Sequence, residues 1–304
     1  MNIFASIFLD DILPIFLVAC VGYLLAWRLG TSVKTLSAVS FNALSPCLVF
    51  SQLVQSSIGG GVFGRMALFC VLLTLVMGGV AWLASVPFRL NRQTFVSFLL
   101  VVMFSNSGNY ALPVVLFAFG RDALAYASVY FVASAMVTYA VGVPVAASGR
   151  GNVGQALKGI VRVPALYAVA AAGLLLATGT AVPLAIMRPI ALLGDAAIPI
   201  MLLILGMQLE RAAMPNRPGV VGLAVALSLL IGPLVGVTLT MLLGLTGVAR
   251  QVAIVGASMP AAVITTVFAL EFDLDASFAT SAVFLSTILS PVTLVLLIAY
   301  LKRA

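Results

Sequence analysis

A polar run at residues 105–109, Ser-Asn-Ser-Gly-Asn, interrupts an apolar stretch of the chain and is followed by Pro113. Gly and Pro break a membrane-spanning helix and free backbone N–H and C=O groups, for which lipid offers no hydrogen-bond partner. Such a break persists only inside protein or beside a wet cavity, and broken helices near the membrane midplane are where transporters bind substrates and ions. The run therefore predicts a binding site for a polar solute. The alternative is a proline kink that neighbouring helices satisfy.

A second interruption, Ser-Met-Pro at residues 258–260, lies in a later apolar stretch. Two broken helices that cross would turn two half-helix N-termini toward one point, each with unpaired N–H groups and about +0.5 charge. This arrangement favours an anion, and the Asn and Ser side chains would bind a carboxylate without the cost of a buried cation. In the alternative interpretation these side chains cap the broken ends, which is compatible with binding.

Asp195 is the only acidic residue deep inside a predicted span. A carboxylate there costs about 2.5–3.5 kcal/mol on insertion scales, so it needs a task or a partner. It could bind a proton or a cation, contact the substrate pathway, cap a break at Pro199, or pair with Arg188 about two helical turns earlier. Asn42 occupies the corresponding place in an earlier span and is expected on the same pathway wall. The predicted substrate-binding residues are Asn106, Ser107, Gly108, Asn109, Pro113, Ser258, Met259, Pro260 and Asn42, with Asp195 as the candidate for ion or proton coupling.

The residue types exclude several kinds of chemistry. The chain has no histidine, which removes Ser-His triads, haem ligation by His and His proton relays. Its three cysteines lie in separate apolar runs without CxxC spacing, so neither a metal site nor a disulfide framework is predicted. The sequence has no Gly-x-x-x-x-Gly-Lys loop and only one deep carboxylate, so we expect no ATP use, no cofactor and no enzyme activity.

The elements that must position these residues are membrane-spanning helices. The chain is 63% hydrophobic and 8% charged, with a mean hydropathy of +1.25, and its 304 residues suffice for about ten spans of roughly 20 residues. The net charge of +7 comes from bases at span ends, so it indicates membrane orientation and not a nucleic-acid partner. The predicted spans are approximately 11–29, 33–56, 63–85, 93–119, 122–147, 163–180, 184–209, 219–244, 250–271 and 276–301.

The longest polar interval, from Ser148 to Lys158, divides these spans into two halves of five. An odd number of spans makes the two halves enter the membrane from opposite sides, as in an inverted-topology repeat. The interruptions fall in the fourth span of each half, which supports such a repeat. We therefore expect an all-α integral membrane protein of two inverted five-helix repeats, with crossed and broken fourth and ninth helices.

Lys and Arg favour one set of alternate loops, and this bias predicts the orientation. The favoured set holds Arg28, Lys34, Arg89, Arg92, Arg150, Lys158, Arg162, Arg211 and Arg217, and the other holds Arg65, Arg121, Arg188, Arg250, Lys302 and Arg303. The first set should be cytoplasmic. Both termini are then expected on the periplasmic or extracellular face of the cell's inner (plasma) membrane.

Three features together resemble the auxin efflux carrier family, and in particular its short prokaryotic members. They are the five-plus-five arrangement, the motif Asn-Ser-Gly-Asn-Tyr-Ala-Leu-Pro at 106–113, and the motif Ser-Met-Pro-Ala at 258–261. The resemblance covers nearly the whole chain. Plant members usually carry a long hydrophilic loop between the fifth and sixth spans, where this chain has only the short connection at 148–158.

The resemblance implies a bile-acid-symporter-like fold that forms a homodimer. A scaffold domain that dimerises would comprise 1–62 and 160–217, and a transport domain that moves elevator-fashion would comprise 63–150 and 218–304. By the same analogy Asn109 and Pro260 would lie at the crossover, while Asn42 and Asp195 would face the site from the scaffold.

The leading hypothesis is a secondary transporter of a small organic anion, a mono- or dicarboxylate of the malonate or malate type, which is what the resemblance implies for prokaryotic members. The expected partners are this substrate, the lipid bilayer and a second copy of the chain. The alternative is a Na⁺- or H⁺-coupled carrier of a cation or a neutral solute that uses Asp195. A passive channel or a sensor is a further alternative.

Overall fold

The computed structural model describes residues 3–56, 60–147, 161–210 and 217–303. The predicted polar interval 148–158 and Arg211 lie outside these ranges. Within them all regular secondary structure is helical, apart from one isolated antiparallel bridge, and this confirms the predicted all-α membrane fold. Seven helices in the described ranges are long and apolar enough to cross a membrane. The helices, in chain order, are α1 (Ile3–Ser6), η1 (Ile7–Ile12), α2 (Leu13–Leu29), α3 (Val33–Val39), η2 (Ser40–Leu44), α4 (Ser45–Val54), α5 (Gly60–Ser85), η3 (Val86–Phe88), α6 (Arg92–Met103), α7 (Ala111–Phe119), α8 (Arg121–Val137), η4 (Thr138–Gly142), α9 (Val143–Ala146), α11 (Pro164–Thr178), α12 (Leu184–Glu210), α13 (Pro218–Ala226), η5 (Leu227–Ile231), α14 (Gly232–Leu242), α15 (Gly247–Ala257), α16 (Ile264–Glu271) and α17 (Ala276–Leu301).

Each predicted span corresponds to one helix or to consecutive helices. The fourth and ninth spans are the broken ones, α6 with α7 and α15 with α16, as predicted. The first helix begins at Ile3, earlier than the predicted residue 11, because α1 and η1 pack against α17 and η1 also packs against α7. α12 continues through Pro189 and Pro199 without a break, so Asp195 caps no interruption there.

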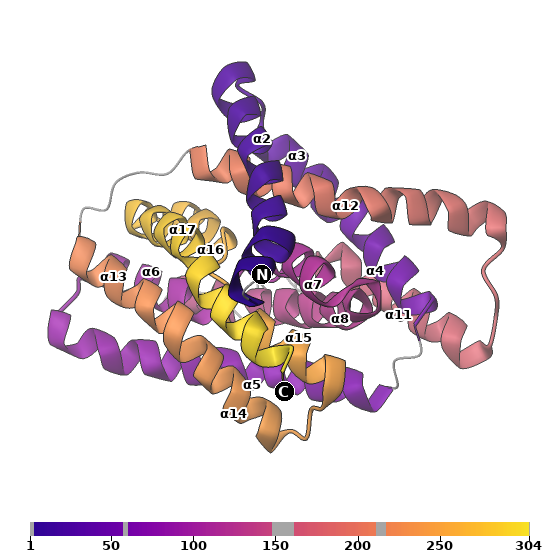
Figure 1. Cartoon of the computed structure of the whole chain (residues 1–304). Coiled ribbons are helices and arrows are strands. Elements are labelled where there is room, and N and C mark those ends of the chain that lie inside the picture. The colour runs from indigo at the N-terminus through magenta and orange to yellow at the C-terminus, as the bar shows by residue number, and fades with distance from the viewer. Residues whose placement is uncertain (1–2, 57–59, 148–160, 211–216, 304) are drawn as a thin grey trace.

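The helices pack in two groups around a shared centre. α2 and α4 each pack against α12, with α11 against α4, while α5, α6, α8, α14 and α15 form contacts of their own. In Figure 1, α12 runs along one side of the molecule and α5 along the opposite side, with α7, α8 and α15 between them. Direct contacts between the groups include α4 with α8 and α12 with α7.

Local sequence signals fix the ends of several helices. Asn91 and Asp275 act as N-caps: the Asn91 side chain accepts from the Thr94 N–H at 2.9 Å, and Asp275 accepts from the Phe278 N–H at 3.0 Å. Gly120, with φ of +82°, forms the sharp turn between α7 and α8. These caps and turns position the short half-helices on which the central site is built.

α2 and α12 touch backbone to backbone. A Cβ placed on Gly22 would lie 2.0 Å from the Leu203 carbonyl oxygen, and one placed on Gly206 would lie 1.7 Å from the Ala19 carbonyl oxygen. Small residues at helix interfaces allow this close approach in membranes, where packing drives association. The glycines therefore lock α12, and the residues near its C-terminal end, in place beside α2.

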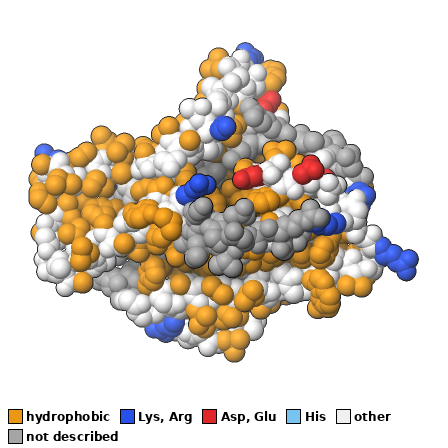
Figure 2. Space-filling view, turned by 180° about the vertical axis from the view of Figure 1, so that it is seen from behind, with side chains coloured by type: hydrophobic (Ala, Val, Ile, Leu, Met, Phe, Trp, Pro, Cys, Tyr) orange, Lys and Arg blue, Asp and Glu red, His pale blue; other side chains and the backbone are white. Residues whose placement is uncertain are grey.

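The outer surface is that of a protein surrounded by lipid. Large apolar side chains such as Trp27, Leu83, Leu192 and Leu242 are more than half exposed. Figure 2 shows hydrophobic side chains over much of one face, with Lys and Arg in isolated positions. Apolar surface on this scale suits a bilayer, because in water it would drive association.

Candidate functional site

The two broken helices meet through a short stretch of paired extended backbone. Ser105 and Ala261 form an antiparallel bridge. The Asn106 N–H donates to the Pro260 carbonyl at 2.8 Å, and the Ala262 N–H donates to the Phe104 carbonyl at 2.8 Å. This pairing satisfies backbone groups that the helix breaks release, which a break inside a membrane requires.

Side chains complete the hydrogen bonding of the crossover, the place where residues 104–106 pair with residues 260–262. The Ser105 hydroxyl donates to the Gly256 carbonyl at 2.9 Å, and the Ser258 hydroxyl donates to the Ile254 carbonyl at 2.7 Å. The Ser286 hydroxyl of α17 accepts from the Ala261 N–H at 3.2 Å. Ser258 thus caps the end of its own half-helix, as the capping interpretation of this residue expected.

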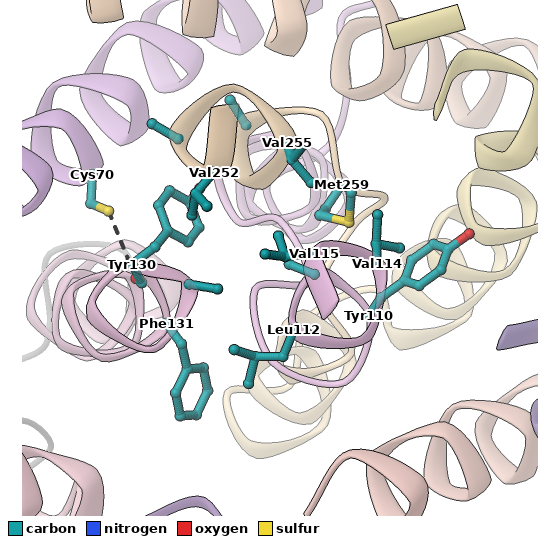
Figure 3. Close-up of a cluster of buried hydrophobic side chains, with 14 of the residues drawn as sticks. Cys70, Tyr110, Leu112, Val114, Val115, Tyr130, Phe131, Val252, Val255 and Met259 are labelled. Carbon is teal, nitrogen blue, oxygen red and sulfur yellow. Dashed lines mark hydrogen bonds between the residues drawn. The ribbon is translucent and has the colours of Figure 1, made fainter. Parts of the chain in front are cut away.

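A buried hydrophobic cluster packs against the crossover. Figure 3 shows Leu112 and Val115 of α7, Val252 and Val255 of α15 and Tyr130 of α8 gathered together. Gly256 allows the tightest contact, because a Cβ at this position would lie 2.3 Å from the Tyr130 ring. The two broken segments are therefore packed firmly against α8.

The crossover forms one wall of a cavity of about 270 Å³. Residues 105–109 and 262–264 lie on that wall, so the cavity is adjacent to the N-terminal ends of α7 and α16. α12, the α3–η2–α4 run and the α8–η4 run complete it. The lining comprises Ser37, Ser40, Phe41, Ser45, Ser105, Asn106, Ser107, Gly108, Asn109, Phe131, Ala135, Thr138, Tyr139, Met201, Ile204, Gln208, Ala262, Val263, Ile264 and Val267.

The electrostatics of this cavity come from dipoles. No charged side chain is among the described residues that line it. The positive ends of two half-helices, by contrast, adjoin it, as the sequence argument for an anion site supposed. A cavity of this kind favours a solute of low charge with a negative end. In the described ranges no three His, Cys, Asp or Glu side chains lie close enough together to ligate a metal.

Two amide side chains on the cavity wall have a buried atom without a hydrogen-bond partner in the described part of the chain. They are Nδ2 of Asn106, a residue only 5% exposed, and Oε1 of Gln208 near the end of α12. A buried polar group left unsatisfied costs about 1–3 kcal/mol. Both atoms are closed off from solvent although their residues line the cavity, so a small rotation of either amide would let a solute supply its missing partner.

The structure brings four of the predicted site residues together and places the others elsewhere. Asn106, Ser107, Gly108 and Asn109 line the cavity. Met259 lines a much smaller neighbouring cavity at the C-terminal ends of α6 and α15. The remaining four are outside the lining of the main cavity. Pro113 is buried within α7, and Ser258 and Pro260 are buried at the second helix break. Asn42 is exposed, with its Nδ2 donating to the Ala38 carbonyl at 2.8 Å.

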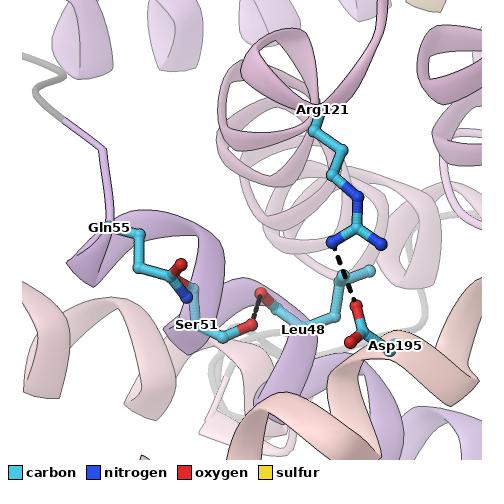
Figure 4. Close-up of polar contacts among 5 residues, drawn as sticks. All are labelled: Leu48, Ser51, Gln55, Arg121 and Asp195. Carbon is cyan, nitrogen blue, oxygen red and sulfur yellow. Dashed lines mark hydrogen bonds and ion pairs between the residues drawn. The ribbon is translucent and has the colours of Figure 1, made fainter.

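Asp195 lies outside the main cavity and pairs with Arg121. Oδ1 of Asp195 is 3.4 Å from an Arg121 guanidinium nitrogen, and their side chains are 58% and 74% exposed. Figure 4 shows Arg121 extending from the start of α8 toward Asp195 on α12. Of the alternatives weighed for Asp195, an ion pair is present, but its partner is Arg121 and not Arg188. Both residues line a separate, largely apolar cavity between α12, α4 and the α7–α8 turn.

The sequence reasoning missed the polar residues that line the cavity from neighbouring spans. Ser37, Ser40 and Ser45 share one face of the second span, and Thr138 and Tyr139 lie in the fifth. Gln208 stands two residues before the end of the long α12. The only sign of these residues in the sequence was a polar side chain inside an apolar run. This sign is a weak indication of a binding site, because Ser and Thr commonly hydrogen-bond to the backbone of their own helix.

An apolar, all-helical molecule with a polar cavity at the crossing of two broken helices has the architecture of a membrane transporter. The comparison with protein families agrees. The family described as membrane transport protein matches residues 7–153 and 151–298, so the chain belongs to this family, which is the auxin efflux carrier family that the motifs had indicated.

Similar proteins occur in archaea and plants. The chain is 27% identical over 294 residues to an uncharacterized transporter of Methanothermobacter thermautotrophicus, covering 94% of this chain and 95% of the relative. It is 24% identical over 292 residues to an uncharacterized transporter of Methanocaldococcus jannaschii, covering 93% and 95%. It is also 31% identical over 120 residues to the probable auxin efflux carrier component 1b of Oryza sativa subsp. japonica, covering 38% of this chain and 22% of the rice protein.

Proposed function

We propose that this protein is a secondary transporter that carries a small organic anion, a mono- or dicarboxylate, across the membrane. The observation that supports this most directly is Asn106, a residue that lines an uncharged cavity and whose buried Nδ2 lacks a partner in the described residues. A carboxylate would accept a hydrogen bond from this group and be stabilised by the adjacent positive ends of α7 and α16. The names of the two archaeal relatives and of the rice relative support transport.

We further propose that transport proceeds by an elevator-type movement between a scaffold and a transport domain within a homodimer. The packing of α2 and α4 on α12, with α11 on α4, is what a scaffold would need, and the packing of α5, α6, α8, α14 and α15 among themselves is what a moving unit would need. The solute would lie between them, because α12 supplies one wall of the cavity and the crossover supplies another.

The test is uptake of radiolabelled malonate, malate, indole-acetate and simple monocarboxylates into proteoliposomes, with imposed pH or Na⁺ gradients to identify the coupling ion. We expect saturable uptake of at least one acid by the native protein. Asn106→Ala should reduce this uptake at least tenfold without lowering the unfolding temperature, because Nδ2 has no partner within the described structure to lose.

Gln55→Ala is the matched control, because Gln55 is an exposed amide whose Nε2 donates to the carbonyl of Ser51 on its own helix. It should leave uptake unchanged. If well-folded native protein takes up none of these acids, the proposal of an organic-anion carrier fails. If Asn106→Ala transports as the native protein does, the assignment of the site fails.

A further inference from the structure

Gln208 belongs to neither of the two motifs that indicated the site. It nevertheless carries one of the two amide atoms on the cavity wall that lack a hydrogen-bond partner. Its Oε1 is buried and has no hydrogen-bond donor among the described residues. It is contributed by α12, whereas Asn106 belongs to the crossover. The two amides therefore belong to different packing groups of helices.

The two unpartnered atoms differ in chemistry. Nδ2 of Asn106 needs an acceptor, and Oε1 of Gln208 needs a donor. A carboxylate supplies only acceptors, so a simple carboxylate would satisfy Asn106 and leave Gln208 unpaired. A solute that satisfies both carries a hydroxyl or N–H group in addition to its carboxylate.

The rest of the lining limits the charge and shape of the solute. Phe41, Phe131, Ile204 and Val267 give much of the wall an apolar character. Because no described lining residue is cationic, a second carboxylate would be buried without a counter-charge, which is costly. One negative charge and an apolar body fit this wall best.

We infer that Gln208 is a specificity-determining residue, and that the site selects a monocarboxylate bearing a hydrogen-bond donor, such as a hydroxy acid with an apolar chain, over its deoxy analogue and over dicarboxylates. This inference rests on the proposed function. The physical reason for selection is that a hydroxyl supplies the donor that the buried acceptor lacks in the empty site, whereas a deoxy acid leaves the acceptor unpaired as before.

The test compares matched acids that differ by one hydroxyl: lactate with propanoate, and 3-phenyllactate with 3-phenylpropanoate. Each is measured by its inhibition constant against uptake of the best labelled acid in proteoliposomes. We expect the native protein to bind each hydroxy acid about tenfold more tightly than its deoxy partner. Malonate should compete more weakly than a hydroxy monocarboxylate.

Gln208→Met keeps the size of the side chain and removes both of its hydrogen-bonding groups. This variant should bind hydroxy and deoxy acids within about twofold of each other, while its affinity for the deoxy acids stays native. Gln55→Met is the matched control and should retain the native preference. A native protein without hydroxyl preference, or a Gln208→Met variant that keeps the preference, overturns the inference although acids are transported. Absence of uptake of every acid instead overturns the proposed function, and the two failures are thereby distinguished.

Discussion

The contact between α2 and α12 gives the sharpest prediction about stability. A Cβ on Gly206 would lie 1.7 Å from the Ala19 carbonyl oxygen and 2.8 Å from the Tyr23 backbone nitrogen. Both are backbone atoms, so no side chain can rotate away. To restore an ordinary carbon–oxygen distance the two helices must separate by about 1.5 Å, which breaks contacts along a closely packed interface.

Overpacking a core typically costs about 1–3 kcal/mol, and this backbone clash falls at the upper end, so we expect Gly206→Ala to cost about 3 kcal/mol. For a chain of 304 residues that corresponds to a fall of about 5 °C in the unfolding temperature. The measurement is thermal unfolding of purified protein in detergent, followed by tryptophan fluorescence and by size-exclusion chromatography after heating.

Gly173→Ala is the matched control, because Gly173 lies within helix α11 and a Cβ there would meet nothing within 4 Å. We expect it to unfold at or slightly above the native temperature, since Ala is the better helix former. A Gly206→Ala variant that unfolds within a degree of the native protein would refute the backbone-to-backbone contact of α2 and α12.

Two further predictions concern the ion pairs. The Asp11 side chain is 8% exposed and its Oδ2 lies 2.6 Å from Lys302 Nζ. Lys302→Met leaves this buried carboxylate unpaired, so it should lower the unfolding temperature more than the double variant Asp11→Leu/Lys302→Met does. Equal unfolding temperatures of the two variants would contradict this. The exposed Arg121–Asp195 pair should contribute at most about 1 kcal/mol to stability. Asp195→Asn should therefore unfold within about 3 °C of the native protein and keep its uptake. Loss of ion-coupled uptake in this variant would instead support a coupling role for Asp195.

The spans and the broken helices could be predicted because the bilayer imposes strict rules on the sequence. The last span, for example, was expected at 276–301 and is α17, Ala276–Leu301. The break at 105–109 was visible because a Gly and several polar residues in an apolar run have few structural explanations. The second break was expected beside the first because the two halves were predicted to be repeats. The Ser105–Ala261 bridge confirms that the two breaks lie side by side.

The walls of the cavity and the partner of Asp195 could not be predicted in the same way. Arg121 and Asp195 are far apart in the sequence, and their contact depends on how the α7–α8 turn approaches α12. Asn42 was predicted to line the substrate pathway, but it is exposed, and its side chain donates to the backbone of its own helix. Which face of an apolar helix is buried is poorly marked when lipid, like the core, is apolar.

The positions of the cavity and of the ion pairs can be compared with the topology that the sequence predicts. Ser37 and Gln208 lie near helix ends that the Lys and Arg bias predicts to be cytoplasmic, so on that prediction the cavity would lie nearer the cytoplasmic side. Arg121 and Lys302 lie at ends assigned to the opposite side, and each bonds to the scaffold segment proposed above, at Asp195 and at Asp11. Both ion pairs of the described residues thus join the two proposed domains on the side away from the cavity. In an elevator the partly buried Asp11–Lys302 contact would be the one that holds the two domains in this arrangement, and the transport domain would have to exchange it to carry its solute across.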